Sequence, residues 1–362
     1  MRRVALIGTG LVGGSIGLAL MRAGTEVLGF DADHSRALRA KELGAVSEVA
    51  SSVAEAVEGV DAVVVAVPVG HVAEVVVAAL DAGAPLVTDV GSVKTPVVHA
   101  VERARPALAA RFVGGHPMAG SEQEGLDGAD AELFHGATWV LTPTPDTDPD
   151  VFGALRALVV SLGAEVVAVT PEHHDALVAV VSHVPQLAAS TLMDVAAEQG
   201  EQHATLLRLA AGGFRDMTRI AASHPGIWPD ICVANRDAIV AALDEYVGAL
   251  ARVRALVDVG DRDGLLDVLQ RARRARRNLP VGATVSGPLV ELRVPVPDRP
   301  GVLAEVTTLA GRLGVNIADL EIAHSMEGQA GVLVLVVAEA GAADLERGLE
   351  ELGYHVSRSS LQ

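Results

Sequence analysis

Residues 3–13 read Arg-Val-Ala-Leu-Ile-Gly-Thr-Gly-Leu-Val-Gly. A short β-favouring run leads into glycines at positions 8, 10 and 13, and helix-forming residues follow from Ser15 to Ala23. A strand, a glycine turn and a helix in this order are the context in which the G-x-G-x-x-G spacing binds the pyrophosphate of a dinucleotide. The stretch therefore predicts that the chain opens with a nucleotide-binding βα unit.

A second short strand, Glu26 to Phe30, ends in Asp31. An acidic side chain about 20 residues after the glycines accepts hydrogen bonds from the adenosine ribose and repels the extra phosphate of NADP. Arg36 weakens that preference, so the sequence predicts NAD, with NADP less favoured. The predicted cofactor-binding residues surround the glycine turn and a later strand end: Gly8, Gly10, Leu11, Val12, Gly13, Asp31, Val67 and Pro68.

Strands and helices go on alternating to about residue 170. Further strands are expected at residues 61–67, 85–90, 112–113, 138–141 and 165–169. This alternation is typical of a doubly wound parallel sheet. It predicts an α/β Rossmann domain over residues 1–170.

Two different patterns follow the Rossmann part. Residues 171–280 are rich in Ala, Leu and Val at helical spacing without strand alternation, which predicts an all-helical domain. After a linker, residues 288–362 alternate as β-α-β-β-α-β, which predicts a small ferredoxin-like domain.

Composition limits the function classes. The chain has 362 residues, half of them hydrophobic, with 46 acidic against 28 basic residues and a net charge of −18. This composition excludes wholesale disorder, and the negative charge repels the phosphates of nucleic acids and anionic lipids. A small anionic substrate stays possible if arginines gather locally, whereas nucleic acid is not an expected partner.

The sequence also bears on the compartment. The N-terminal apolar run is interrupted by glycines and no A-x-A cleavage site follows, so we interpret it as a strand rather than a signal peptide. Apolar stretches elsewhere, such as residues 62–69, are too short to cross a membrane. A single cysteine, Cys232, excludes an intrachain disulfide and favours a reducing compartment. We therefore expect a cytoplasmic protein without a membrane partner.

A candidate catalytic base lies in residues 113–122, Val-Gly-Gly-His-Pro-Met-Ala-Gly-Ser-Glu. Glycines and a proline present His116 directly after a strand, as a loop that approaches a ligand closely would do. The alternative is a solvated loop histidine. Ser92, in the segment Asp89–Lys94 after the preceding strand, either orients a hydroxyl or His116, or caps a helix that starts near Pro96.

The helical part contains further candidates with alternatives. His183 is an imidazole in an apolar helix and could equally be a buried core histidine. Arg219 lies beyond a glycine pair and either clamps a carboxylate or pairs with Asp216. The segment His173-His174-Asp175 suggests a metal ligand set, but no other ligand spacing supports one, so no metal is expected.

Five ordered motifs together resemble the prephenate and arogenate dehydrogenases. They are the glycine turn at residues 8–13, Asp-Val-Gly-Ser-Val-Lys at 89–94, Gly-His-Pro-Met-Ala-Gly-Ser-Glu at 115–122, Val-Ser-His-Val-Pro at 181–185 and Thr-Arg-Ile-Ala at 218–221. The resemblance covers residues 1 to about 279. The tail, with Val-Pro-Asp-Arg-Pro-Gly-Val-Leu at 296–303 and Gly-Val-Asn-Ile at 314–317, resembles an ACT domain, which binds amino acids between copies.

The resemblance implies an oxidative decarboxylation in tyrosine biosynthesis. A cyclohexadienyl alcohol loses a hydride to NAD while His116 takes the hydroxyl proton and Ser92 helps to hold the hydroxyl. It also implies a homodimer formed through the helical domain. The residues implied for the substrate are Arg219 on a carboxylate, His183, Glu122 at the mouth of the pocket, Ser121, Gln186 and Trp228.

One position departs from the family pattern. Prephenate-preferring members often have a second histidine where this chain has Gln186, which favours acceptance of arogenate. The ACT resemblance implies regulation by a tyrosine-like effector. The residues implied for it are Asp298, Arg299, Gly301, Val302, Leu303, Asn316 and Ile317.

Two other functions are compatible with parts of this pattern. A β-hydroxyacid-type dehydrogenase relies on a lysine in its helical part, whereas the lysines of this chain are Lys41 and Lys94. A non-catalytic sensor of NAD and an amino acid is disfavoured by the joint presence of His116, Ser92, Arg219 and Asp31.

Overall fold

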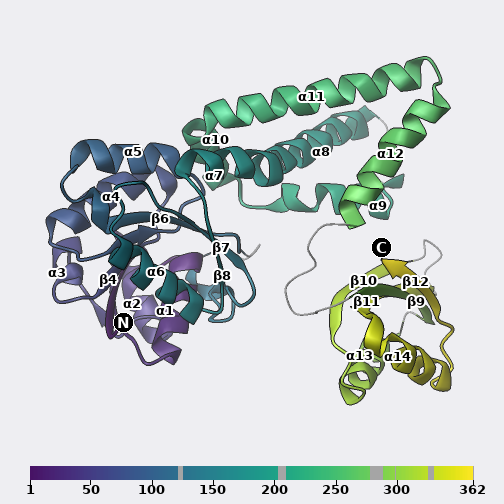
Figure 1. Ribbon diagram of the computed structural model, residues 1–362, viewed down its shortest axis with the longest axis horizontal. Coiled ribbons are helices and arrows are strands. Elements are labelled where there is room, and N and C mark those ends of the chain that lie inside the picture. The colour runs from purple at the N-terminus through teal and green to yellow at the C-terminus, as the bar shows by residue number, and fades with distance from the viewer. Residues whose placement is uncertain (121–124, 203–208, 278–287, 298, 325–329, 362) are drawn as a thin grey trace. The chain divides into compact units, whose positions relative to one another are not determined.

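The computed structural model describes residues 1–120, 125–202, 209–277, 288–297, 299–324 and 330–361 (Figure 1). By contacts the chain divides into two compact units. The first comprises Met1–Met193 and Ile220–Tyr246, and the second Asp194–Arg219 and Val247–Gln362. The division passes through the helical segment 171–280, and the three predicted domain boundaries stay predictions.

The first unit is built on an eight-stranded sheet with the order β3-β2-β1-β4-β5-β6-β7-β8. Its strands are β1 Arg3–Ile7, β2 Glu26–Phe30, β3 Glu48–Val49, β4 Ala62–Val65, β5 Val87–Asp89, β6 Phe112–Pro117, β7 Thr138–Thr142 and β8 Glu165–Ala168. The first six are parallel and have the strand order of a Rossmann sheet, as predicted.

The edge beyond β6 differs from a fully parallel sheet. Strand β7 pairs antiparallel with β6, and β8 pairs parallel with β7. Between β6 and β7 the described residues contain a 3₁₀ turn, Leu126–Gly128, and no crossover helix. Antiparallel neighbours need no crossover helix, so the loop after His116 returns at the same end of the sheet.

Helices cover both faces of this sheet (Figure 1). They are α1 Leu11–Arg22, α2 His34–Glu42, α3 Val53–Val57, α4 Val69–Asp81, α5 Thr95–Ala104 and α6 Pro149–Ser161. Alternate residues of β1 enter two different cores, with Leu6 packing among α1, α2 and α6, and Ile7 among α3, α4 and α5. The doubly wound arrangement places the carboxyl ends of the parallel strands, and the loops that follow them, along one edge of the sheet, perpendicular to the strands.

A helical segment follows β8. Helix α7 Pro171–Val178 continues through a π-helical turn, Ala179–His183, into α8 Val184–Gln202, and α10 Trp228–Ala234 and α11 Arg236–Asp258 come later. Residues Pro171–Gly200 have the length and mean hydropathy, 1.5, of a membrane-crossing helix, which corrects the expectation that every apolar stretch is too short. However, the segment carries buried His174, Asp175 and His183, which is typical of a core helix rather than a lipid-facing one.

The second unit contains α9 Gly212–Thr218, α12 Arg262–Arg277 and the predicted β-α-β-β-α-β tail. The tail elements are β9 Leu289–Pro297, α13 Val302–Arg312, β10 Ile317–His324, β11 Ala330–Ala338, α14 Glu339–Glu351 and β12 Ser357–Leu361. The strands form an antiparallel sheet in the order β10-β11-β9-β12, with its own core against the two helices.

Candidate active site

The three glycines of the opening turn have different structural roles. Gly8 has φ +96°, and a Cβ there would lie 2.4 Å from the carbonyl oxygen of Ala66. A Cβ on Gly13 would lie 2.1 Å from the carbonyl oxygen of Gly8, so α1 packs directly on the turn. A Cβ on Gly10 would meet no atom within 4 Å. Two glycines are therefore required by the fold itself, and Gly10 leaves room for a ligand at the helix N-terminus.

Asp31 is held against this turn. Its Oδ2 accepts hydrogen bonds from the backbone N–H of Thr9 at 2.8 Å and from the Thr9 hydroxyl at 3.0 Å, and its Oδ1 accepts the N–H of Asp33 at 2.9 Å. Val67 and Pro68 follow β4 at the same edge of the sheet, and Leu11 and Val12 open α1. The donors and the open backbone at this edge fit a dinucleotide with its ribose on Asp31.

A buried ion pair fixes the strand that carries His116. The Lys94 ammonium pairs with the Asp89 carboxylate and donates to the carbonyl oxygen of Gly115 at 2.7 Å, while the Gly115 N–H donates to Asp89 Oδ1 at 3.2 Å. Both charged side chains are fully buried. Burial lowers the pKa of Lys94, although the adjacent Asp89 carboxylate acts to raise it. The pair holds the backbone on the N-terminal side of His116 at the sheet edge.

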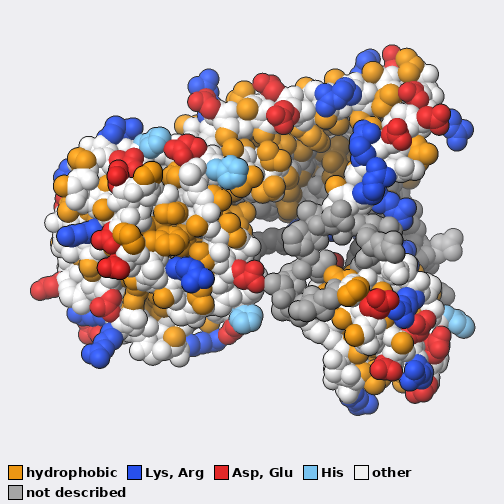
Figure 2. Space-filling view, in the orientation of Figure 1, with side chains coloured by type: hydrophobic (Ala, Val, Ile, Leu, Met, Phe, Trp, Pro, Cys, Tyr) orange, Lys and Arg blue, Asp and Glu red, His pale blue; other side chains and the backbone are white. Residues whose placement is uncertain are grey.

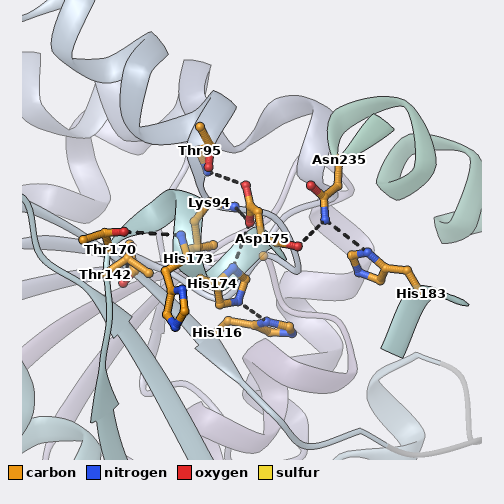
Figure 3. Close-up of polar contacts among 12 residues, drawn as sticks. Lys94, Thr95, His116, Thr142, Thr170, His173, His174, Asp175, His183 and Asn235 are labelled. Atoms are coloured by element: carbon orange, nitrogen blue, oxygen red, sulfur yellow. Dashed lines mark hydrogen bonds and ion pairs between the residues drawn. The ribbon is translucent and has the colours of Figure 1, made fainter. Parts of the chain in front are cut away.

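His116 faces a histidine from α7 (Figure 3). His116 Nδ1 lies 2.8 Å from His174 Nε2, and His174 Nδ1 lies 2.8 Å from Asp175 Oδ1. Burial, and then the nearby His174, Lys94 and His183, hold the pKa of His116 well below 6.5. His116 is therefore neutral at neutral pH, as a proton acceptor must be.

The sequence did not identify His174 and Asp175 as partners of His116. It singled out the segment only as a metal candidate, and the described residues contain no cluster of three or more metal-ligating side chains. The buried residues of α7 follow helical spacing and are Pro171, His174, Asp175 and Val178. Two polar residues on that buried stripe are the signal that could have revealed them.

His183 lies at the end of the π-helical turn and is 1% exposed. The side-chain amide of Asn235 donates to the carbonyl oxygen of Asp175 at 2.9 Å and lies 3.3 Å from His183 Nδ1 (Figure 3). Because a carbonyl only accepts, the atom facing it is the amide nitrogen, and its second hydrogen is donated to His183 Nδ1. The remaining proton of neutral His183 is then on Nε2, where it can be donated to a ligand.

Burial lowers the pKa of His183 from 6.5 to about 4. The unfolded chain takes up this proton near pH 6.5 and the folded chain only near pH 4, so stability falls as the pH drops between these values. The loss for this group is about 2 kcal/mol at pH 5. In His183→Asn, the difference in unfolding free energy between pH 7 and pH 5 should shrink by about that amount. Urea unfolding at both pH values measures it, with exposed His34→Asn as the control, and an unchanged difference would contradict the shift.

The other predicted substrate residues have mixed outcomes. Gln186 is buried one turn beyond His183, with its Nε2 3.4 Å from the Ser190 hydroxyl. The Trp228 ring lies edge-on to the ring of His183, with 6.1 Å between the ring centroids. The buried Nε1 of Trp228 has no hydrogen-bond partner among the described residues. Arg219 opens a 3₁₀ turn and belongs to the second unit, so its place at the substrate stays a prediction. Ser121 and Glu122 lie outside the described residues.

Ser92 lies between β5 and α5. Helix α5 begins at Thr95, and the Ser92 hydroxyl does not cap it, so the capping alternative is wrong. The Asp175 carboxylate accepts the first backbone N–H groups of this helix instead. Ser92 forms no hydrogen bond with any described residue, and its role towards a substrate hydroxyl stays a prediction.

The predicted effector residues form two groups in one copy of the tail. Arg299, Gly301, Val302 and Leu303 follow the end of β9, whereas Asn316 and Ile317 lead into β10; Asp298 lies outside the described residues. Val290 and Ile317 both pair with Val337, and Pro297 pairs with Ala330. The group near Ile317 is therefore level with Val290, and the group after Pro297 lies seven residues further along β9, a separation of roughly 23 Å along the strand.

The fold and the geometry of this edge define the chain as an NAD-linked oxidoreductase with a Rossmann domain and a candidate histidine base. Residues 16–168 match the family model of the prephenate dehydrogenase nucleotide-binding domain, residues 170–271 that of its dimerization domain, and residues 290–354 that of the ACT domain. The chain belongs to the prephenate dehydrogenase family.

Relatives and solved structures support this. The prephenate dehydrogenase of Bacillus subtilis is 34% identical over 336 residues, which cover 91% of this chain and 90% of the relative. The structure of Aquifex aeolicus prephenate dehydrogenase with hydroxyphenyl propionate and NAD+ aligns with a TM-score of 0.71 at 31% identity, covering 77% of this chain and 99% of that one. Synechocystis arogenate dehydrogenase aligns with a TM-score of 0.67 at 29% identity, covering 76% and 99%.

Proposed function

We propose that the chain oxidises and decarboxylates prephenate, L-arogenate or both, with NAD as hydride acceptor, in tyrosine biosynthesis. The proposal rests on the state and position of His116. This histidine is neutral and hydrogen-bonded through Nδ1, and it lies at the carboxyl end of β6, on the same side of the sheet as the glycine turn. The family membership gives the substrate class, since relatives named for prephenate and for arogenate both match.

Bound NAD supplies the acceptor for the hydride of the substrate carbinol carbon. His116 accepts the hydroxyl proton at Nε2, and Ser92 holds the hydroxyl. The cyclohexadienyl ring then loses carbon dioxide as it becomes aromatic. This step needs no dedicated catalytic group from the chain, because aromatisation drives it.

Substrate carboxylates need positive or hydrogen-bonding partners. Arg219 has a guanidinium, and His183 and Trp228 each have a ring N–H that donates to no described residue. Gln186, one turn from His183, presents a neutral amide at the position that distinguishes the two substrates. Ser121 and Glu122, which follow β6 in the chain, complete the proposed set.

Substrate and cofactor choice can be measured directly. We expect purified protein to form NADH from both L-arogenate and prephenate, with kcat/KM for arogenate at least equal to that for prephenate. Because the Asp31 carboxylate repels a 2′-phosphate, kcat/KM with NADP should be at least about tenfold lower. Gln186→His should shift the ratio towards prephenate. No turnover with either substrate would favour a non-catalytic sensor.

The tail supports a regulatory role. The two groups of effector residues lie at opposite ends of one sheet, which supports an effector site completed by a second copy. We expect L-tyrosine to inhibit the full chain and removal of residues 288–362 to abolish that inhibition. Asn316→Ala changes an exposed residue and should weaken inhibition without loss of basal turnover. Inhibition that survives both changes would place tyrosine at the active site instead.

We also propose a homodimer in the cytoplasm. The matched dimerization domain covers residues 170–271, and Figure 2 shows apolar side chains gathered along the helical segment. Val233, Val247 and Val257 in this segment are each at least 60% exposed. Such side chains are typical of helices that pack against another copy. The single cysteine, which is free, supports a reducing compartment.

A further inference from the structure

We propose that His174 and Asp175 are positioning residues, which keep the proton of neutral His116 on Nδ1 and so leave Nε2 as the accepting atom. The inference deepens the proposed function, because it assigns the orientation of the base in that reaction. It rests on the chain of hydrogen bonds from Asp175 through His174 to His116 (Figure 3).

The proton positions follow from the donor and acceptor rules of each group. An ionised carboxylate only accepts, so the hydrogen between Asp175 Oδ1 and His174 Nδ1 belongs to the histidine. In the proposed arrangement His174 carries this one proton only, so its Nε2 has a lone pair, and the hydrogen in the 2.8 Å contact with His116 belongs to His116 Nδ1. Neutral His116 therefore carries no proton on Nε2. A doubly protonated His174 would reverse this order.

The carboxylate at the start of this chain is held rigidly. Asp175 is 4% exposed, and its Oδ1 and Oδ2 accept the backbone N–H groups of Lys94 and Thr95, each at 2.8 Å. Burial acts to raise the pKa of Asp175, but the hydrogen bonds from His174 and from these two backbone groups outweigh it and lower the pKa. An ionised carboxylate held by three hydrogen bonds thus fixes the ring of His174.

The same chain stabilises the product of proton transfer. When the substrate O–H bond breaks, its proton binds His116 Nε2 and its electron pair forms the carbonyl as the hydride leaves for NAD. His116 becomes an imidazolium whose Nδ1 proton still points at His174. The new positive charge is therefore linked through one neutral ring to the negative charge of Asp175, as in other catalytic histidines backed by a carboxylate.

The test reads the tautomer independently of turnover. Histidine ¹⁵N NMR at pH 8, on the full chain with NAD and without substrate, should show His116 protonated at Nδ1 and not at Nε2, with the resonance assigned by its loss in His116→Asn. His174→Phe keeps a ring of similar shape and should remove this preference. It should also lower kcat about 100-fold, with KM for substrate and NAD changed less than about threefold. His173→Phe, at the exposed neighbouring position, is the matched control and should change neither readout.

The outcomes separate this inference from the proposed function. His116 protonated at Nε2 in the wild-type chain, or kcat of a folded His174→Phe within threefold of wild type, would overturn the positioning role. The wild-type spectrum decides the question even if His174→Phe does not fold. If His116 is protonated at Nδ1 but the protein turns over neither substrate, the positioning role of His174 and Asp175 stands and the proposed reaction is wrong.

Discussion

Replacing His116 with asparagine is expected to lower kcat at least 100-fold while the Kd for NAD stays within about threefold of wild type. General-base catalysis contributes roughly 10² to 10⁴ to a rate, and an amide cannot accept a proton near neutral pH. Asparagine is still short and polar enough to form a hydrogen bond with His174, so strand β6 and the glycine turn should keep their structure. Steady-state rates with prephenate and arogenate, and calorimetric titration with NAD, measure the two effects.

Two controls make this result specific. His173→Asn changes an exposed histidine next to His174 and should leave kcat unchanged. Thermal unfolding of His116→Asn should stay close to wild type, because the asparagine amide can still donate to His174 Nε2. Near-normal turnover in a folded His116→Asn would show that another group takes the proton.

The sequence predicted those parts of the fold that depend on local pattern. The glycine turn, the strand ending in Asp31 and the alternation up to residue 90 all depend on residues close together in the chain. The β-α-β-β-α-β tail was predicted for the same reason. The antiparallel pairing of β7 was not predicted, because apolar runs of similar length form either kind of pair.

The candidate site shows the same limit more sharply. The glycines and proline around it marked His116, but the prediction that it lies in a loop was wrong, because it belongs to strand β6 and is paired with Val140. Its partner His174 lies 58 residues further on in a helix. Adjacent histidines at 173 and 174 look alike in the sequence, and only the helix packing exposes one and buries the other. Likewise, the Asp175 carboxylate accepts the N–H of Thr95 at the start of α5 from 80 residues away, whereas the sequence offered only the nearby Ser92 as an alternative cap. Long-range pairing of polar groups is set by tertiary packing, which a local pattern does not contain.

The glycine turn gives a second large effect, because two of its glycines should fail in different ways when changed to alanine. At Gly10 an added Cβ meets no atom within 4 Å and the backbone φ is −74°, so Gly10→Ala should fold normally. The added methyl group would occupy the space that the pyrophosphate needs, and the Kd for NAD should rise at least about tenfold. At Gly13 the Cβ would lie 2.1 Å from the Gly8 carbonyl oxygen, and α1 would have to move. We expect Gly13→Ala to lose about 2 kcal/mol of stability, or about 5 °C in Tm, in the absence of NAD.

Gly153→Ala is the matched control, since Gly153 lies in α6 with open space around it. It should keep NAD affinity and gain up to about 1 kcal/mol from helix propensity. Thermal unfolding without NAD, followed by calorimetric titration with NAD, separates the three variants. If Gly10→Ala binds NAD as tightly as wild type, the pyrophosphate does not pass over this residue. If Gly13→Ala unfolds at the wild-type temperature, helix α1 can move away from the turn at little cost, and Gly13 would then be required only for the cofactor.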